Sequence, residues 1–199
     1  MNHPATAAEA VAALERGEAV IFPTDTVYGV GVSVRHAESP EKLYQLKQRD
    51  ARKPVAWLVG SAGDLARFGE DVPALASALA RAFWPGPLTL IVRASESVPR
   101  AFCSAAGTVG LRMPDSATAL GLLRLVGAPL ATTSANPSGA PAPRCFADVD
   151  AAFAAQVGCV VVDDAPRSGV ASTILDCTGD HPLLVREGGI TVADMRAVG

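Results

Sequence analysis

Apolar positions recur along this 199-residue chain with two spacings, which predict short helices and short strands. Ala10, Val11 and Leu14 lie at helical spacing, and Gly17 follows them as a stop signal. The segment 88–92 is apolar and β-branched at its end, which is typical of a strand. The expected helices are 7–16, 40–47, 73–84, 116–126, 147–156 and a last turn at 192–198. The expected strands are 19–22, 54–59, 88–92, 109–112, 129–132, 159–162, 172–176 and 183–186.

These elements mix irregularly and do not form strict strand–helix–strand units. Such a mixture predicts an α/β fold, with an open twisted mixed sheet flanked by helices. The length suits one domain, and no internal repeat or linker divides the chain. We therefore expect a single domain over residues 1–199.

Charge and cysteine content narrow the functional classes. The net charge is −3, whereas proteins that bind nucleic acid mainly through its phosphates are usually basic. Any basic groove must therefore be local, which suits a small polyanion. Four widely spaced cysteines without a CxxC pair indicate reduced thiols in a cytoplasmic protein. The N-terminus does not read as a signal peptide, and no apolar run reaches the roughly 20 residues that span a membrane.

The densest positive charge lies at 47–53, where Lys47, Arg49, Arg52 and Lys53 fall within seven residues. Arginine offers phosphate oxygens a planar fork of donors, and lysine offers a mobile point charge. A solvated basic turn at a helix C-terminus would have the same composition. The segment alone leaves both interpretations open.

Two polar segments follow expected strands. On an extended chain Thr132, Ser134 and Asn136 would face one way and supply both donors and acceptors. The segment 21–29 likewise delivers Thr24, Asp25, Thr26 and Tyr28 to a tight loop. Each segment could also be an ordinary turn whose side chains bond their own backbone.

Arg112 and Arg186 stand in otherwise apolar strands. A charge in such a strand needs a partner, which can be an anionic ligand, a structural carboxylate or solvent. Phosphate-loop, nucleophile-elbow and HExxH motifs do not occur, and the three histidines have no clustered partners. We therefore expect no catalytic nucleophile and no metal site built by the protein.

Seven segments in order resemble the YrdC/TsaC family of L-threonylcarbamoyladenylate synthases in its single-domain form. Each is weak alone, but the ordered set is specific and extends over residues 7–190. The segments are 22–29 (FPTDTVYG), 47–54 (KQRDARKP), 84–89 (WPGPLT), 109–114 (VGLRMP), 133–139 (TSANPSG), 172–173 (ST) and 186–190 (REGGI).

The resemblance implies a YrdC/RibB-like fold with a basic concave face. It implies that L-threonine, bicarbonate and ATP, with Mg²⁺ carried by the ATP, give L-threonylcarbamoyl-AMP and pyrophosphate. The product of this nucleotidyl transfer is used in t6A37 modification of tRNA by a separate threonylcarbamoyl transferase complex. The resemblance is also compatible with a weak contact between this chain and tRNA. The matching ATP-binding residues are Lys47, Arg49, Lys53, Thr108, Ser134, Asn136, Ala142 and Arg186. The matching threonine-binding residues are Thr26, Arg112, Thr132 and Ser172.

One position departs from the family pattern. Longer members carry a histidine near the threonine carboxylate, five residues after the position of Lys53, and this chain has Leu58 there. The resemblance to the single-domain form also implies that the additional C-terminal domain of those members is not expected here. Threonine recognition is therefore expected to depend more on Arg112.

Two other functions fit parts of the pattern. A non-catalytic RNA-binding module would use a basic concave face, although the net charge of −3 and the few aromatic residues disfavour it. A carbamoyl-transfer domain related to hydrogenase-maturation proteins would also activate a carbamoyl group with ATP. Such domains usually belong to larger chains.

Overall fold

The computed structural model describes residues 4–48 and 55–198. Its α-helices are α1 (Ala7–Glu15), α2 (Glu41–Lys47), α3 (Asp64–Phe68), α4 (Ala74–Phe83), α5 (Ala117–Val126), α6 (Ala151–Ala154) and α7 (Val192–Arg196), with 3₁₀ turns at Arg100–Phe102 and Phe146–Asp148. Its strands are β1 (Val20–Pro23), β2 (Tyr28–Ser33), β3 (Ala56–Leu58), β4 (Gly69–Glu70), β5 (Leu88–Ala94), β6 (Thr108–Arg112), β7 (Leu130–Ser134), β8 (Cys159–Val160), β9 (Thr173–Asp176) and β10 (Leu183–Arg186).

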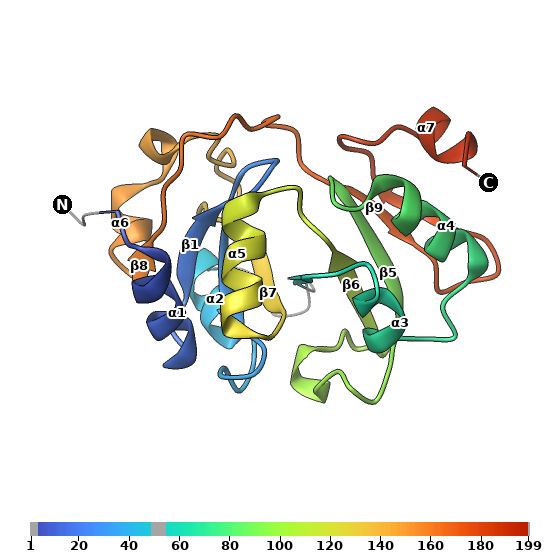
Figure 1. The fold of residues 1–199 in the computed structure, drawn as a ribbon, viewed down its shortest axis with the longest axis horizontal. Coiled ribbons are helices and arrows are strands. Elements are labelled where there is room, and N and C mark those ends of the chain that lie inside the picture. Colours follow the sequence, from blue (N-terminus) through green and yellow to red (C-terminus); the bar gives the residue numbers. More distant parts are fainter. Residues whose placement is uncertain (1–3, 49–54, 199) are drawn as a thin grey trace.

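The strands of the described residues form one mixed sheet in the order β10-β9-β5-β6-β3-β7-β2-β1-β8, with β4 added beside β5. The pairs β1/β8, β3/β6 and β5/β9 are parallel, and the remaining pairs are antiparallel. Figure 1 shows β1, β7 and β8 in one half of the molecule and β5, β6 and β9 in the other. The predicted α/β fold with a mixed sheet flanked by helices is confirmed.

Side chains alternate between the two faces of the sheet, as strand geometry requires. On one face Phe22, Leu58 and Leu130 pack beneath α1 and α5, which lie side by side in Figure 1. On the other face Ile21 and Trp57 belong to a larger core that also takes apolar side chains from α2, α3 and α4. The helices α1 and α5 cover only part of their face.

Local signals explain where the covering helices begin and end. Thr6 and Glu9 form a capping box at the start of α1, and Ser116 caps α5 by accepting the amide of Ala119. Gly127 ends α5 with a φ of 64°, a left-handed conformation that favours glycine. The expected stop at Gly17 is likewise confirmed by a φ of 72°.

Three elements of the structure were not predicted from the sequence: β2, α3 and β4. The strand β2 alternates Gly29 and Gly31 with apolar residues, so its pattern lacks the usual strand composition. Close packing explains the glycines, because a Cβ on Gly31 would lie 2.9 Å from Thr132 Oγ1 and 3.1 Å from Phe22 Cε1. A predicted helix at 147–156 is also shorter, since α6 spans only Ala151–Ala154.

Candidate active site

An open cavity of about 360 Å³ lies on the same sheet face as α1 and α5, in the part that these helices leave uncovered. Strand ends from both halves of the sheet supply its walls, together with the loops after β1 and β7. The lining residues are Thr24, Thr26, Val27, Gly29, Ala56, Leu58, Thr89, Arg112, Thr132, Thr133, Ser134, Asn136, Ala140, Ala142, Ala171, Ser172, Ile174 and Arg186.

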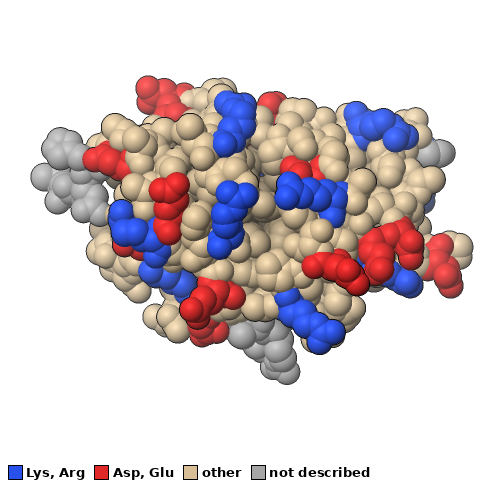
Figure 2. Space-filling model, turned by 60° about the horizontal axis from the view of Figure 1, so that its bottom comes forward, with Lys and Arg blue, Asp and Glu red and all other residues tan. Residues whose placement is uncertain are grey.

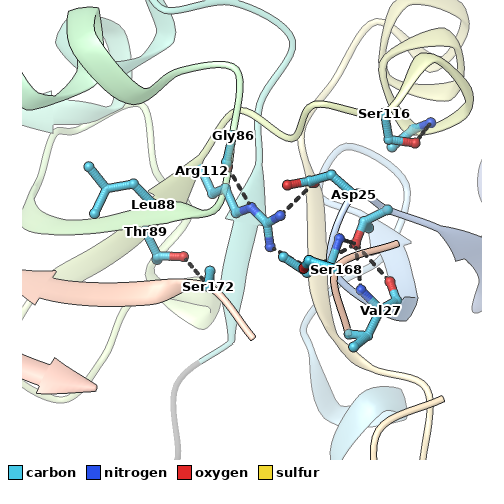
Figure 3. Close-up of polar contacts among 12 residues, drawn as sticks. Asp25, Val27, Gly86, Leu88, Thr89, Arg112, Ser116, Ser168 and Ser172 are labelled. Atoms are coloured by element: carbon cyan, nitrogen blue, oxygen red, sulfur yellow. Dashed lines mark hydrogen bonds and ion pairs between the residues drawn. The ribbon is translucent and has the colours of Figure 1, made fainter. Parts of the chain in front are cut away.

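Arg112, at the end of β6, is the most constrained charge in this cavity. Its Nε donates to the carbonyl of Gly86 (3.0 Å), Nη1 to Thr26 Oγ1 (3.2 Å) and Nη2 to Asp25 Oδ1 (2.5 Å). Figure 3 shows the guanidinium between Gly86 on one side and Asp25 on the other. Burial lowers the pKa of Arg112, and Arg186 lowers it further, against the opposing effect of Asp25. A guanidinium has five N–H donors, so these contacts leave one donor on each terminal nitrogen for a ligand.

The loop after β1 orients the Thr26 hydroxyl. Thr24 Oγ1 donates to the carbonyl of Val27 (2.7 Å), accepts from the amides of Thr26 and Val27, and lies 3.0 Å from Thr26 Oγ1. Because the Thr24 proton is already used, Thr26 donates to Thr24 and accepts from Arg112. The loop therefore holds Arg112 Nη1 in place through the Thr26 hydroxyl.

Lys47 lies beneath the loop after β7 and holds its shape. Four oxygen atoms surround its Nζ: the carbonyls of Ser134 (2.7 Å) and Asn136 (2.6 Å), Asn136 Oδ1 (3.2 Å) and Ser134 Oγ (3.4 Å). The Asn136 amide nitrogen in turn donates to the carbonyls of Pro137 and Ala140. The Lys47 and Asn136 side chains thus bond this segment of the chain itself, and Ser134 and Asn136 line the cavity.

Arg186 closes the opposite wall. Its Nε and Nη2 donate to the carbonyl of Ser172 at 3.0 and 2.8 Å, and Nη2 also lies 3.1 Å from Ser172 Oγ. Desolvation lowers the pKa of Arg186. In the described part of the chain Arg186 forms no ion pair, so its charge is available to an anion in the cavity.

The structure brings together most of the residues predicted from the sequence. Eight of them line the cavity: Thr26, Arg112, Thr132, Ser134, Asn136, Ala142, Ser172 and Arg186. Lys47 bonds the wall from behind. Thr108 stands at the other end of β6 from Arg112, where its hydroxyl bonds Ser104 Oγ at 2.7 Å. Arg49 and Lys53 lie outside the described residues, so their predicted contacts with phosphate stay predictions.

Sequence reasoning missed two roles at this cavity. Asp25 was expected only as a polar side chain of the tight loop in segment 21–29, but its carboxylate is paired with Arg112. Thr89 was not selected at all, although it lines the cavity and bonds Ser172. The signal for Thr89 was present in the segment 84–89, whose last residue it is.

Figure 2 shows Lys and Arg side chains spread over the face it draws, with Asp and Glu side chains between them. The basic concave face stays a prediction, because two of its expected cations are Arg49 and Lys53. Among the described residues, no group of three or more His, Cys, Asp or Glu side chains is arranged to hold a metal ion. None of the described helices is long and apolar enough to cross a membrane.

Comparison with known proteins decides the family. The family model described as telomere recombination, which covers Sua5, YciO and YrdC, matches residues 12–188. The chain belongs to the Sua5/YciO/YrdC family.

Two similar proteins and one solved structure place the chain within the Sua5/YciO/YrdC family. A threonylcarbamoyl-AMP synthase of Pyrococcus abyssi is 36% identical over 93% of this chain and 54% of the relative. A putative threonylcarbamoyl-AMP synthase of Mycobacterium leprae is 42% identical, over 96% of this chain and 86% of the relative. The crystal structure of P. abyssi Sua5 complexed with L-threonine has a TM-score of 0.89 at 36% identity, covering 95% of this chain and 56% of that one. This chain therefore spans about half the length of the P. abyssi relative.

Proposed function

We propose that this chain is an enzyme, a nucleotidyltransferase that makes L-threonylcarbamoyl-AMP from L-threonine, bicarbonate and ATP and releases pyrophosphate. The observation that carries the proposal is one cavity lined by two arginines, Arg112 and Arg186, and by the Ser134 loop. Relatives named threonylcarbamoyl-AMP synthase support the same reaction.

Arg112 is suited to the threonine carboxylate. Its two remaining N–H donors are held in place by contacts to Asp25, Thr26 and Gly86, and a planar fork of this kind matches a carboxylate. Binding the carboxylate there would leave the amine free to react. Thr26, Thr132 and Ser172 complete this part of the cavity.

The chemistry needs position and charge and no protein nucleophile. The free amine of threonine attacks the carbon of CO₂ derived from bicarbonate, forms an N–C bond and loses a proton, which gives a carbamate. A carbamate oxygen then attacks the α-phosphorus of ATP, and the bond to the leaving pyrophosphate breaks. Arg186 would stabilise the negative charge on the phosphates, with Arg49 and Lys53 in the same role. Mg²⁺ bound to the ATP phosphates would neutralise further charge.

The product would serve the t6A37 modification of tRNA and pass to a separate threonylcarbamoyl transferase complex. Pyrophosphate release with ATP, bicarbonate and each of the twenty amino acids tests the proposal. We expect release that depends on L-threonine. Release that is equal with all amino acids, or absent with all of them, would overturn the proposed reaction.

The rival interpretation, an RNA-binding module without catalysis, predicts a different result. It requires tight RNA binding that weakens steeply with salt, together with no ATP-dependent activity. Measurement of both properties on the same preparation separates the two functions.

A further inference from the structure

The segment 161–172, here called the crossing segment, runs from the end of β8 in one half of the sheet to the start of β9 in the other (Figure 1). On its way it bonds the loop after β1. The amide of Ser168 donates to the carbonyl of Asp25 at 3.0 Å, and the amide of Gly169 donates to the carbonyl of Thr26 at 2.9 Å. Figure 3 shows Ser168 beside this loop. The crossing segment therefore holds the backbone of the two residues whose side chains bond Arg112.

Arg167, directly before these two amides, anchors the crossing segment to the sheet. Its side chain is 6% exposed, and Nη2 forms an ion pair with Asp163, while Nη1 donates to the carbonyl of Ala165 at 2.9 Å. The guanidinium carbon lies 4.4 Å from the centre of the Tyr28 ring, which is fully buried in β2. Thr118, in α5, donates to the other oxygen of the Asp163 carboxylate at 2.6 Å. Arg167 thus stacks on the sheet and closes a turn that α5 also holds.

Arg167 lies outside the substrate cavity. The described lining of that cavity does not include it, and Arg167 lines a separate hollow together with Tyr28. Gly169 is needed where it stands, because its φ of 69° is left-handed and a Cβ would lie 2.6 Å from Arg144 Nε. Any effect of Arg167 on a substrate must therefore pass through the amides that follow it.

The far end of the crossing segment is held by other contacts. The amide of Gly189 donates to the carbonyl of Ala171 at 3.1 Å, and the amide of Thr173 donates to the carbonyl of Pro87 at 2.8 Å. These bonds keep Ser172 beside Arg186 without help from Arg167. Loss of the Arg167 anchor should therefore disturb the Arg112 side of the cavity and spare the Arg186 side.

We infer that Arg167 is a positioning residue for the Arg112 guanidinium, acting through the Ser168 and Gly169 amides on the loop of Asp25 and Thr26. This inference rests on the proposed function, in which Arg112 binds the threonine carboxylate. It predicts a selective effect: the affinity for L-threonine depends on Arg167, and the affinity for ATP does not.

Arg167→Met tests the inference, because it removes the ion pair and keeps the length of the side chain. We expect faster hydrogen exchange at the Ser168 and Gly169 amides, measured by NMR. In calorimetric titrations the Kd for L-threonine should rise about tenfold, while the Kd for ATP, measured without threonine, should change less than about twofold.

Gly169→Ala disturbs the same amides without touching the ion pair, so it should show the same selectivity and decides the matter where Arg167→Met does not fold. Gly127→Ala is the matched control. It places alanine at a φ of 64° at the end of α5, away from the cavity, and should change neither affinity.

The outcomes separate this inference from the proposed function. If the natural chain binds L-threonine and Arg167→Met binds it equally well, the inference is wrong and the proposed function stands. Equal weakening of L-threonine and ATP binding would also overturn it, since Arg167 would then support the whole cavity. Unchanged exchange at the two amides would show that Arg167 does not anchor the crossing segment. If the natural chain binds no L-threonine, both fail.

Discussion

Asp25 Oδ1 lies 2.5 Å from Arg112 Nη2, and this ion pair joins the loop after β1 to the end of β6. Both side chains are largely withdrawn from solvent, with exposed fractions of 14% and 8%. Figure 3 shows the two side chains pointing toward one another from these two segments. The charge that is proposed to bind the substrate carboxylate is therefore held by a carboxylate of the protein.

Asp25→Ala should destabilise the protein strongly. Removing one partner leaves the buried Arg112 charge uncompensated, which costs about 3–5 kcal/mol in the free energy of unfolding. Urea denaturation measures the change. Glu18→Ala, which breaks the exposed pair of Arg16 and Glu18, is the matched control and should cost about 1 kcal/mol or less. Equal losses in the two variants would show that the Asp25–Arg112 pair contributes no more than a surface pair.

Lys47→Met should weaken the binding of ATP and of adenosine by the same factor, about tenfold. The reason is that Lys47 bonds the Ser134 and Asn136 oxygens, so its loss disturbs the loop and not a phosphate contact. Calorimetric titration of both ligands gives the two factors. Lys42→Met, an exposed lysine on the same helix, should change neither affinity. A loss confined to ATP would mean that Lys47 contacts phosphate directly.

The contact between Lys47 Nζ and Asn136 Oδ1 predicts that their effects are coupled. The double variant Lys47→Met/Asn136→Ala should have nearly the same affinity for ATP as the single variant that binds ATP less tightly. The reason is that both changes remove contacts that hold the same loop. Fully additive losses would contradict a shared role.

Leu58→His should lower the KM for threonine. Leu58 lines the cavity and is the β3 partner of Arg112, so an imidazole there would lie beside the expected carboxylate site. The same change places a polar group against the apolar side chains beneath α1 and α5, and some stability should be lost. Steady-state kinetics with threonine varied checks the first effect. An unchanged or higher KM would place Leu58 away from the substrate.

Arg49→Ala and Lys53→Ala should abolish formation of the adenylate without unfolding the protein. Both residues lie outside the described part of the chain, and their role follows from the family pattern of 47–54. Pyrophosphate release and circular dichroism together give activity and folding. Unchanged activity in both variants would remove these two residues from the proposed site.

Much of this site could be predicted from order along the chain, because Thr132, Ser134 and Asn136 occupy alternating positions at the end of β7 and in the loop after it. Contacts between distant segments could not be predicted in that way. The partner of Arg112 is Asp25, 87 residues earlier, and the pairing depends on strand order in the sheet. The strand β2 was not predicted, because its two glycines are unusual in a strand. They are needed there because Thr132 and Phe22 approach the backbone closely. The position of Thr89 beside Arg112 likewise depends on the pairing of β5 with β6, although Thr89 itself belongs to the segment 84–89.

The most direct test of the proposed reaction is mass spectrometry of the nucleotide product made from ATP, L-threonine and ¹³C-bicarbonate. If the chain makes L-threonylcarbamoyl-AMP, the adduct contains AMP, threonine and the ¹³C label. An adduct of AMP and threonine without the label would mean that the threonine carboxylate attacks ATP directly. That result, or release of pyrophosphate with no adduct at all, would rule out the proposed reaction.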